Sequence, residues 1–159
     1  MSIIRQDIFD AVQSRFQGIQ IVSGYRTDYG LNVYKWRETS QVTPDEMPCI
    51  LIADTSEEPE LFGAGRACSE KRSLTVEYFL MTDGTDTNSI TTSLRKAQAD
   101  IEDAIRADTS WGNLARWTVP KGNQLGFPPI KEQGLSDLVG VISSSFEIEY
   151  RTAYFNPES

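Results

Sequence analysis

Two glutamates and an arginine alternate near the end of the chain, in the stretch FEIEYR. Glu147, Glu149 and Arg151 fall at i, i+2 and i+4, so in a strand all three side chains lie on one face. Paired carboxylates perform acid–base catalysis where burial or a neighbouring like charge raises the pKa of one of them. Here the counter-charge stands beside them, and nothing apolar nearby would raise a pKa. The pattern therefore predicts a solvated ladder of charges rather than a catalytic pair.

The stretch DGTDTN, residues 83–88, carries the side-chain oxygens that a calcium loop uses. A calcium loop places its ligands at alternate positions and closes with a bidentate glutamate. The donors here fall at Asp83, Asp86 and Asn88, and Leu94 stands where the closing glutamate is required. We therefore predict a turn followed by an Asx cap at the start of a helix, and no metal.

The stretch FGAGRACSEKR contains the pair Gly63-x-Gly65, but no third glycine and no following Lys-Ser or Lys-Thr. It therefore lacks the parts of a phosphate-binding loop. Arg66, Lys71 and Arg72 give this stretch the densest positive charge of an acidic chain. The sequence predicts a flexible hairpin arm that is a solvated loop, and a contact to an acidic partner surface is the functional alternative.

The chain contains no histidine. The usual general base, most zinc sites and any Ser-His or Cys-His nucleophile are therefore excluded. Ser143-Ser144-Ser145 lacks the G-x-S-x-G turn that exposes a serine nucleophile. Two cysteines, Cys49 in a buried-strand pattern and Cys68 in a glycine-rich loop, are expected to be a reduced pair. We expect no enzymatic activity and no cofactor.

Length and charge narrow the remaining classes of protein. The 159 residues are expected to form one domain, 1–159, with a C-terminal tail from about 153 to 159. The formal net charge of −8 argues against binding nucleic acid by neutralising phosphates. No apolar run approaches the roughly 18 residues of a membrane-spanning helix, and MSIIRQDIFD has acids where a signal peptide is apolar. We expect a soluble protein kept in a cytoplasm, with no membrane partner.

Hydrophobic periodicity predicts two helices and five strands. The helices are an N-terminal one capped by Ser2 and ended by Gly18, and one from about Ser89 to Ala107 capped by Asp86 or Thr87. The strands are LNVYKW, a central CILIAD, RSLTVEYFLMT, a short one in WGNLARWTV, and Leu138 to about Thr152. Residues 55–71 and the proline-rich residues 120–137 are predicted to be long loops. This order indicates an α+β fold, with a mainly antiparallel sheet, both helices packed on one face, and an extended C-terminal strand.

That last strand is unusually long. Fully extended it would span nearly 50 Å, against about 20 Å for an ordinary strand. We therefore expect either a bend at Gly140 or at the serine triplet, or an end that leaves the core to reach another surface.

A tetrad of the form Tyr-Arg-Thr-x-Tyr occurs twice, at Tyr25–Tyr29 within GYRTDYG and at Tyr150–Tyr154. The flanking residues disagree, which excludes a longer repeat. Each copy marks the edge of a regular element, where we expect an aromatic ring to pack beside a cation.

The N-terminal amphipathic helix followed by GYRTDYGLNVYKWR resembles the small tail-terminator or tail-completion proteins of tailed bacteriophages. MPCILIAD, RSLTVEYFLMTDGTDTNSITTSLRKAQADIEDAI and the closing FEIEYRTAYFNPES extend the resemblance over nearly the whole chain. The motifs concern architecture and not chemistry.

The resemblance implies a structural virion protein, assembled in the host cytoplasm, that caps a finished tail tube, usually as a six-membered ring. Its implied partners are copies of itself, the tail tube protein and neck or connector proteins, while DNA passes through the lumen without specific binding. On physical grounds, unpaired sheet edges invite head-to-tail pairing, and we expect the overlong last strand to add to a neighbour's sheet. The candidate interaction residues are Arg66, Lys71, Arg72, Glu147, Glu149, Tyr150, Arg151 and Tyr154.

Three alternatives stay open at this point. The chain fits a head-completion or stopper protein between portal and tail. From a different class, it fits a small cytoplasmic enzyme that uses carboxylates alone, which requires two close acids with raised pKa values in one pocket. A monomeric adaptor domain is the third alternative.

Overall fold

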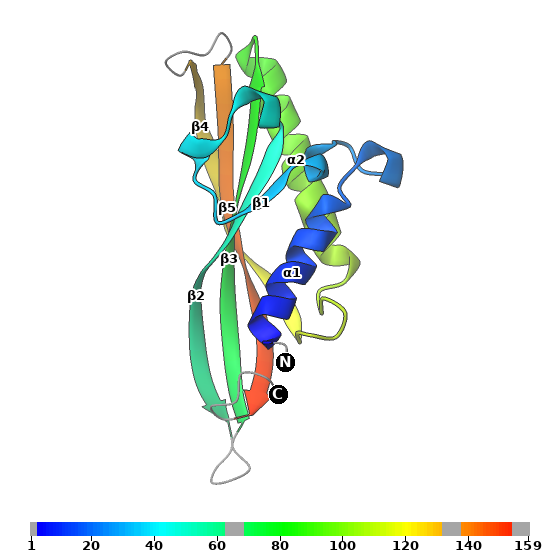
Figure 1. The fold of residues 1–159 in the computed structure, drawn as a ribbon, viewed down its shortest axis with the longest axis vertical. Helices are drawn as coiled ribbons and strands as arrows, with labels where there is room; N and C mark the ends of the chain where they lie inside the picture. Colours follow the sequence, from blue (N-terminus) through cyan, green and yellow to red (C-terminus); the bar gives the residue numbers. More distant parts are fainter. Residues whose placement is uncertain (1–2, 63–68, 132–137, 154–159) are drawn as a thin grey trace.

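The computed structural model describes residues 3–62, 69–131 and 138–153. Five strands form one sheet in the order β1-β2-β3-β5-β4, and two helices pack against it (Figure 1). β1 runs parallel to β2, and the other neighbouring strands are antiparallel. The α+β prediction is confirmed. The bounds are α1 Ile4–Gln17, β1 Val33–Lys35, β2 Cys49–Phe62, β3 Ser69–Gly84, α2 Thr87–Ala107, β4 Trp117–Lys131 and β5 Leu138–Ala153.

Local sequence accounts for where α2 begins. The Asp86 carboxylate accepts a hydrogen bond from the Ser89 backbone N–H at 2.8 Å, and so pairs one of the donors that a first helical turn leaves free. The apolar stripe that follows is buried, in Ile90, Leu94, Ala97, Ile101 and Ala104. The predicted cap and helix are confirmed, and the cap at DGTDTN is an Asx cap.

The core lies between the helices and one face of the sheet. Alternate residues of β2, β3 and β5 pack there with both helices, among them Ile50, Ile52, Leu74, Val76, Tyr78, Leu80, Ile142, Phe146 and Ile148. A second, smaller cluster of Cys49, Leu51, Met81 and Val139 occupies the opposite face. β2 is therefore buried on both faces over Cys49–Ile52, as predicted for a central strand.

Two segments that the sequence predicts as loops form strands. β2 continues to Phe62 and β3 begins at Ser69, so much of 55–71 is a hairpin arm. β4 runs through most of 120–137, and the strand predicted in WGNLARWTV starts only at Trp117. Proline is tolerated in a strand at a sheet edge, because its missing N–H is not needed there. Pro59 and Pro120 both lie in strands that form edges of the described sheet.

The long strand β5 stays in its own sheet. It pairs with β3 from Leu138↔Gly84 to Ala153↔Ser69, without a register shift at Gly140 or in the serine triplet. The expectation that its end leaves the core is wrong for the residues that the structure describes. The long strands are strongly twisted about one another (Figure 1). Because neighbouring strands twist together, a strand as long as β5 can stay paired along its length.

Candidate functional site

The predicted interaction residues do not form one surface. Arg66 and Tyr154 lie outside the described residues. Alternation along β3 and β5 places Lys71, Glu147, Glu149 and Arg151 on the face opposite the helices. The same alternation places Arg72 and Tyr150 on the helix side.

The charges opposite the helices pair within the subunit. Lys71 Nζ lies 3.0 Å from Glu60 and 3.7 Å from Glu149, and Lys121 Nζ lies 2.6 Å from Glu147. The hydrogen bond to Glu60 is the main cause of the raised pKa of Lys71. Glu149 is only 7% exposed, so the prediction of a solvated ladder is wrong at that position. Because Lys71 meets two acids of its own subunit, the prediction that it lies in a solvated loop is also wrong.

Arg72 and Tyr150 belong to a polar cluster on the helix side. Arg72 contacts Glu70 at 3.1 Å and Glu57 at 3.5 Å, and the Tyr150 hydroxyl donates to Glu57. Burial, followed by the adjacent Glu57 carboxylate, raises the pKa of Tyr150. Arg5 of α1 also bonds Glu57, at 2.7 Å. The cluster therefore ties the hairpin arm to β5 and α1, and Arg72 is not on an exposed loop as predicted.

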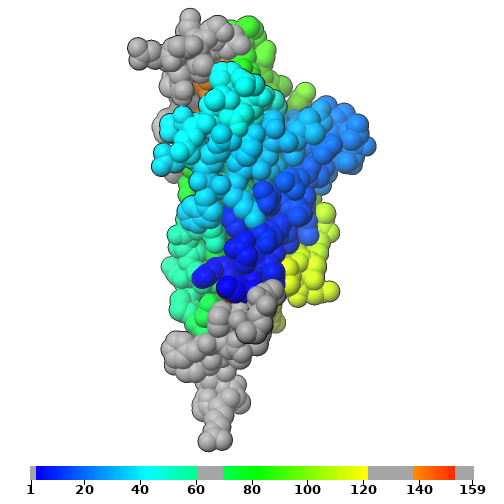
Figure 2. All heavy atoms as spheres, viewed as in Figure 1, coloured from blue at the N-terminus to red at the C-terminus, as the bar shows by residue number. Residues whose placement is uncertain are grey.

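The segment GYRTDYG is fixed to α2 by one buried carboxylate. Asp100 is 0% exposed and accepts from the Arg26 N–H at 3.1 Å, the Arg26 guanidinium at 3.0 Å and the Thr27 hydroxyl at 2.7 Å. Arg26 also bonds Asp103 at 2.8 Å. Figure 2 shows the blue segment that follows α1 projecting from the side of the molecule, and Asp100 fixes the return of this segment.

The attachment of GYRTDYG through Asp100 is called the clamp at Asp100 below, and the remaining residues of the segment complete it. Asp28 accepts from the Ile21 N–H at 2.8 Å, and the Tyr29 hydroxyl lies 2.8 Å from that of Ser93. A Cβ on Gly30 would lie 2.4 Å from the Phe16 carbonyl oxygen, so only glycine fits there. The first tetrad is therefore a structural joint between α1 and α2.

The expectation that each tetrad packs a ring beside a cation is not met as a cation–π contact at Tyr25 or Tyr150. Among the described residues, neither ring has a cation above it. The cation–π contacts there are Arg15 over Trp111, Lys35 over Phe9, Arg37 over Tyr34 and Arg116 over Trp117. Sequence reasoning also missed Asp100, although it lies three residues after Ala97 and four before Ala104 on the apolar stripe of α2.

The carboxylates do not assemble into a metal-binding group. Over residues 3–62, 69–131 and 138–153, no three Cys, Asp or Glu side chains are placed to hold one ion. The acids with strongly lowered pKa values are held by structural hydrogen bonds: Thr43 lowers the pKa of Glu46 to about 2, and Ser110 and Gly112 lower that of Asp108 to about 2. Lowered values favour ionised, structural carboxylates rather than a catalytic acid.

The two edges of the sheet are open over much of their length in the described part of the chain. β1 pairs with β2 only as far as Lys35↔Ile52, while β2 continues to Phe62. On the opposite side, β4 has β5 as its one neighbour. Near its start, Trp117 is 47% and Val119 48% exposed. These edges are the surfaces most suited to binding another chain.

No protein-family model matches the chain, and no curated protein sequence matches it. Neither helix in the described ranges is both long and apolar enough to cross a membrane.

Proposed function

We propose that this chain is a structural virion protein that caps the tail tube of a bacteriophage as a ring, ends tube polymerisation and forms the joint to the head or neck. The observation that carries the proposal is the pair of open edges, β2 on one side of the sheet and β4 on the other. An edge that meets a different edge makes a heterologous contact, and such a contact generates a ring when the rotation closes. The resemblance of the sequence to tail-terminator proteins supports the same assignment.

The charge of the chain suits this role. Six copies at −8 each carry a formal charge of 6 × −8 = −48, which repels the DNA backbone and lets DNA pass without adhering. A ring whose channel wall proved basic would contradict this part of the proposal.

The experiment adds the purified protein to polymerising tail tube protein and measures tube length by negative-stain microscopy. We expect tube growth to stop and one end of each tube to carry a ring. Co-purification with tube subunits supports the tail terminator, whereas co-purification with the portal supports the head-completion or stopper alternative. Unchanged tube length together with no binding to tubes would overturn the proposal.

A further inference from the structure

We propose that the outer edge of β2, from Asp54 to Glu58, binds the start of β4, Arg116–Val119, of a second copy of this chain. Arg116 of that copy then pairs with the Asp54 carboxylate. This inference rests on the proposed ring and names the surfaces that would join its subunits.

The outer edge of β2 becomes free where β1 ends. The Ile50 N–H bonds the Asn32 carbonyl at 2.8 Å, and the Trp36 N–H bonds the Ile52 carbonyl at 2.9 Å. Trp36 has φ 55°, a left-handed conformation unusual for a bulky residue, and the paired strand ends there. Because backbone groups alternate along a strand, Asp54 is the next residue whose N–H and C=O face outward, and the register of β2 against β3 shifts directly after it, between Asp54 and Ser56. The edge therefore presents backbone donors and acceptors where β1 has stopped.

A groove runs beside this edge. It has a volume of about 460 Å³ and lies between α1, the end of β1 and β2. Its lining residues include Arg5, Gln6, Phe9, Lys35, Trp36 and Asp54. The groove is therefore walled by a helix along the path that an added strand would follow.

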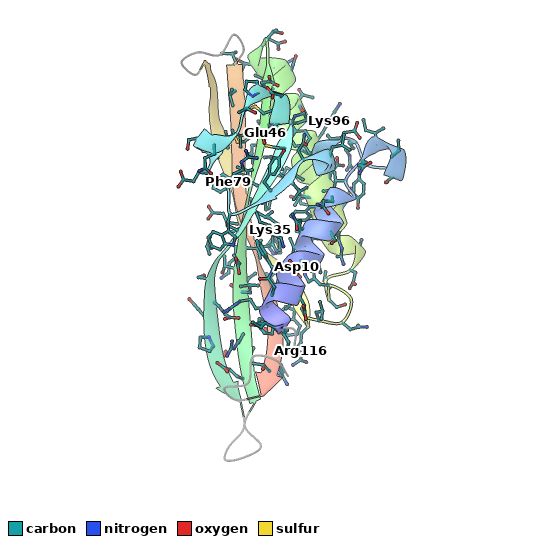
Figure 3. The ribbon with its side chains drawn as sticks, in the orientation of Figure 1. Asp10, Lys35, Glu46, Phe79, Lys96 and Arg116 are labelled. Atoms are coloured by element: carbon teal, nitrogen blue, oxygen red, sulfur yellow. The ribbon has the colours of Figure 1, made fainter. Side chains whose placement is uncertain are left out.

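Asp54 is the unsatisfied group of this groove. Its Oδ1 atom is buried and has no hydrogen-bond partner. The two cations of the lining are already engaged, because Lys35 bonds Asp10 and Arg5 bonds Glu57. Figure 3 labels Lys35 of β1 and Asp10 of α1 in this region. A buried carboxylate oxygen without a donor is costly, so a cation from outside the subunit would stabilise it.

Arg116 supplies the matching cation. Its side chain is exposed, lies over the Trp117 ring at 5.4 Å, and has no carboxylate partner within the described ranges. It stands immediately before β4 (Figure 3), where Trp117 and Val119 are half exposed. A segment whose guanidinium is paired with none of the described carboxylates, and whose side chains favour β-structure, suits an acidic edge.

Charge disfavours a symmetric pairing of two β2 edges. Beyond Asp54, the β2 edge carries Glu57, Glu58 and Glu60, so two β2 edges repel each other. The two segments proposed to pair each end at a proline, Pro59 on β2 and Pro120 on β4. Proline has no backbone N–H to donate to another strand. Both limits favour a short, head-to-tail pairing of β2 with β4, the type of contact that a ring requires.

The first test is cross-linking between separately purified variants, both with Cys68→Ser and with the buried Cys49 retained. One carries Ser56→Cys on the β2 edge and the other Val119→Cys on β4, and a short bis-maleimide joins thiols that approach each other. We expect heterodimers in the mixture and none from either variant alone. Homodimers from the Ser56→Cys variant alone, or no heterodimer in the mixture, would overturn the inference.

The second test is a double-mutant cycle on self-association, measured by sedimentation. Asp54→Asn and Arg116→Gln are each expected to weaken association about tenfold, as for a charge-assisted hydrogen bond, and the double variant no further. Arg95→Gln, which removes an exposed cation of α2, is the matched control and should change nothing. Additive losses, or an equal loss in the control, contradict the pairing. Asp54→Asn should leave the monomer at least as heat-stable as the wild type, which separates lost association from misfolding.

These results separate the two proposals. Rings on tail tubes without the specific heterodimer would refute the inference and leave the function standing. Formation of the heterodimer by a protein that binds no tubes would support the inference and refute the proposed function.

Discussion

The clamp at Asp100 gives the sharpest prediction about stability. Asp100→Ala removes the acceptor of one buried donor, the Thr27 hydroxyl, and of one partly buried donor, the Arg26 backbone N–H. An unsatisfied buried donor costs about 1–3 kcal/mol, and a partly buried donor costs less because water can reach it, so the loss is about 3 kcal/mol for the pair. Loss of the Arg26 guanidinium contact is not counted, because this group is half exposed and stays paired with Asp103.

Urea unfolding followed by tryptophan fluorescence measures this loss, with an unchanged m-value as the sign of two-state behaviour. For a domain of this size, about 3 kcal/mol corresponds to a melting temperature lower by about 6–12 °C. Asp103→Asn is the matched control on the same helix, and it leaves the buried acceptor in place. A loss below about 1 kcal/mol for Asp100→Ala, or equal losses in both variants, would refute the reasoning.

Three further predictions concern single sites. Gly30→Ala should destabilise the fold by at least about 1–3 kcal/mol because its Cβ meets the Phe16 carbonyl, whereas Gly18→Ala, with its nearest atom at 3.2 Å, should change the urea midpoint little. Burial raises the pKa of the Cys49 thiol to about 12, so the protonated thiol stabilises the fold, and this contribution should be lost as pH rises from about 9 toward 12. The native thiol should also resist a thiol reagent at pH 8. The lowered pKa of Glu46 stabilises the fold above pH 4.5, and this effect is lost as pH falls to about 2. Glu46→Gln should therefore flatten the acid limb of stability against pH, and an unchanged limb would contradict this cause.

Periodicity predicted the elements with one buried face correctly. The stripe from Ile90 to Ala104 and the alternation from Leu74 to Leu80 each place apolar side chains against a single core, so the pattern determines the element. α2 and β3 were therefore identified from the sequence, with the cap predicted at Asp86 or Thr87 and found at Asp86.

The outer parts of β2 and β4 were missed because their side chains carry no such pattern. Around Glu58 and Pro59 the hairpin arm is held by ion pairs, and in β4 a proline stands at position 120. A proline at a sheet edge looks the same in the sequence as a proline in a loop. The contacts of Arg72 with Glu57 and of Glu149 with Lys71 were missed for a related reason, since contacts between distant residues leave no signal in local spacing.

The candidate surface itself follows from where β1 ends, and the sequence does not give that endpoint. The run LNVYKW predicts a strand through Trp36, but the left-handed conformation of Trp36 ends the pairing at Lys35. Only the structure shows that Asp54 then faces a groove with one oxygen unpaired.

The most direct test of the central claim is the imaging of tail tubes assembled in the presence of the purified, gold-labelled protein. We expect a ring of label at one end of each tube, and no ring with a variant in which both sheet edges are blocked by charge reversal. Label spread along the tubes, or a monomer that binds no tube end, would contradict the account that this chain works by joining edges.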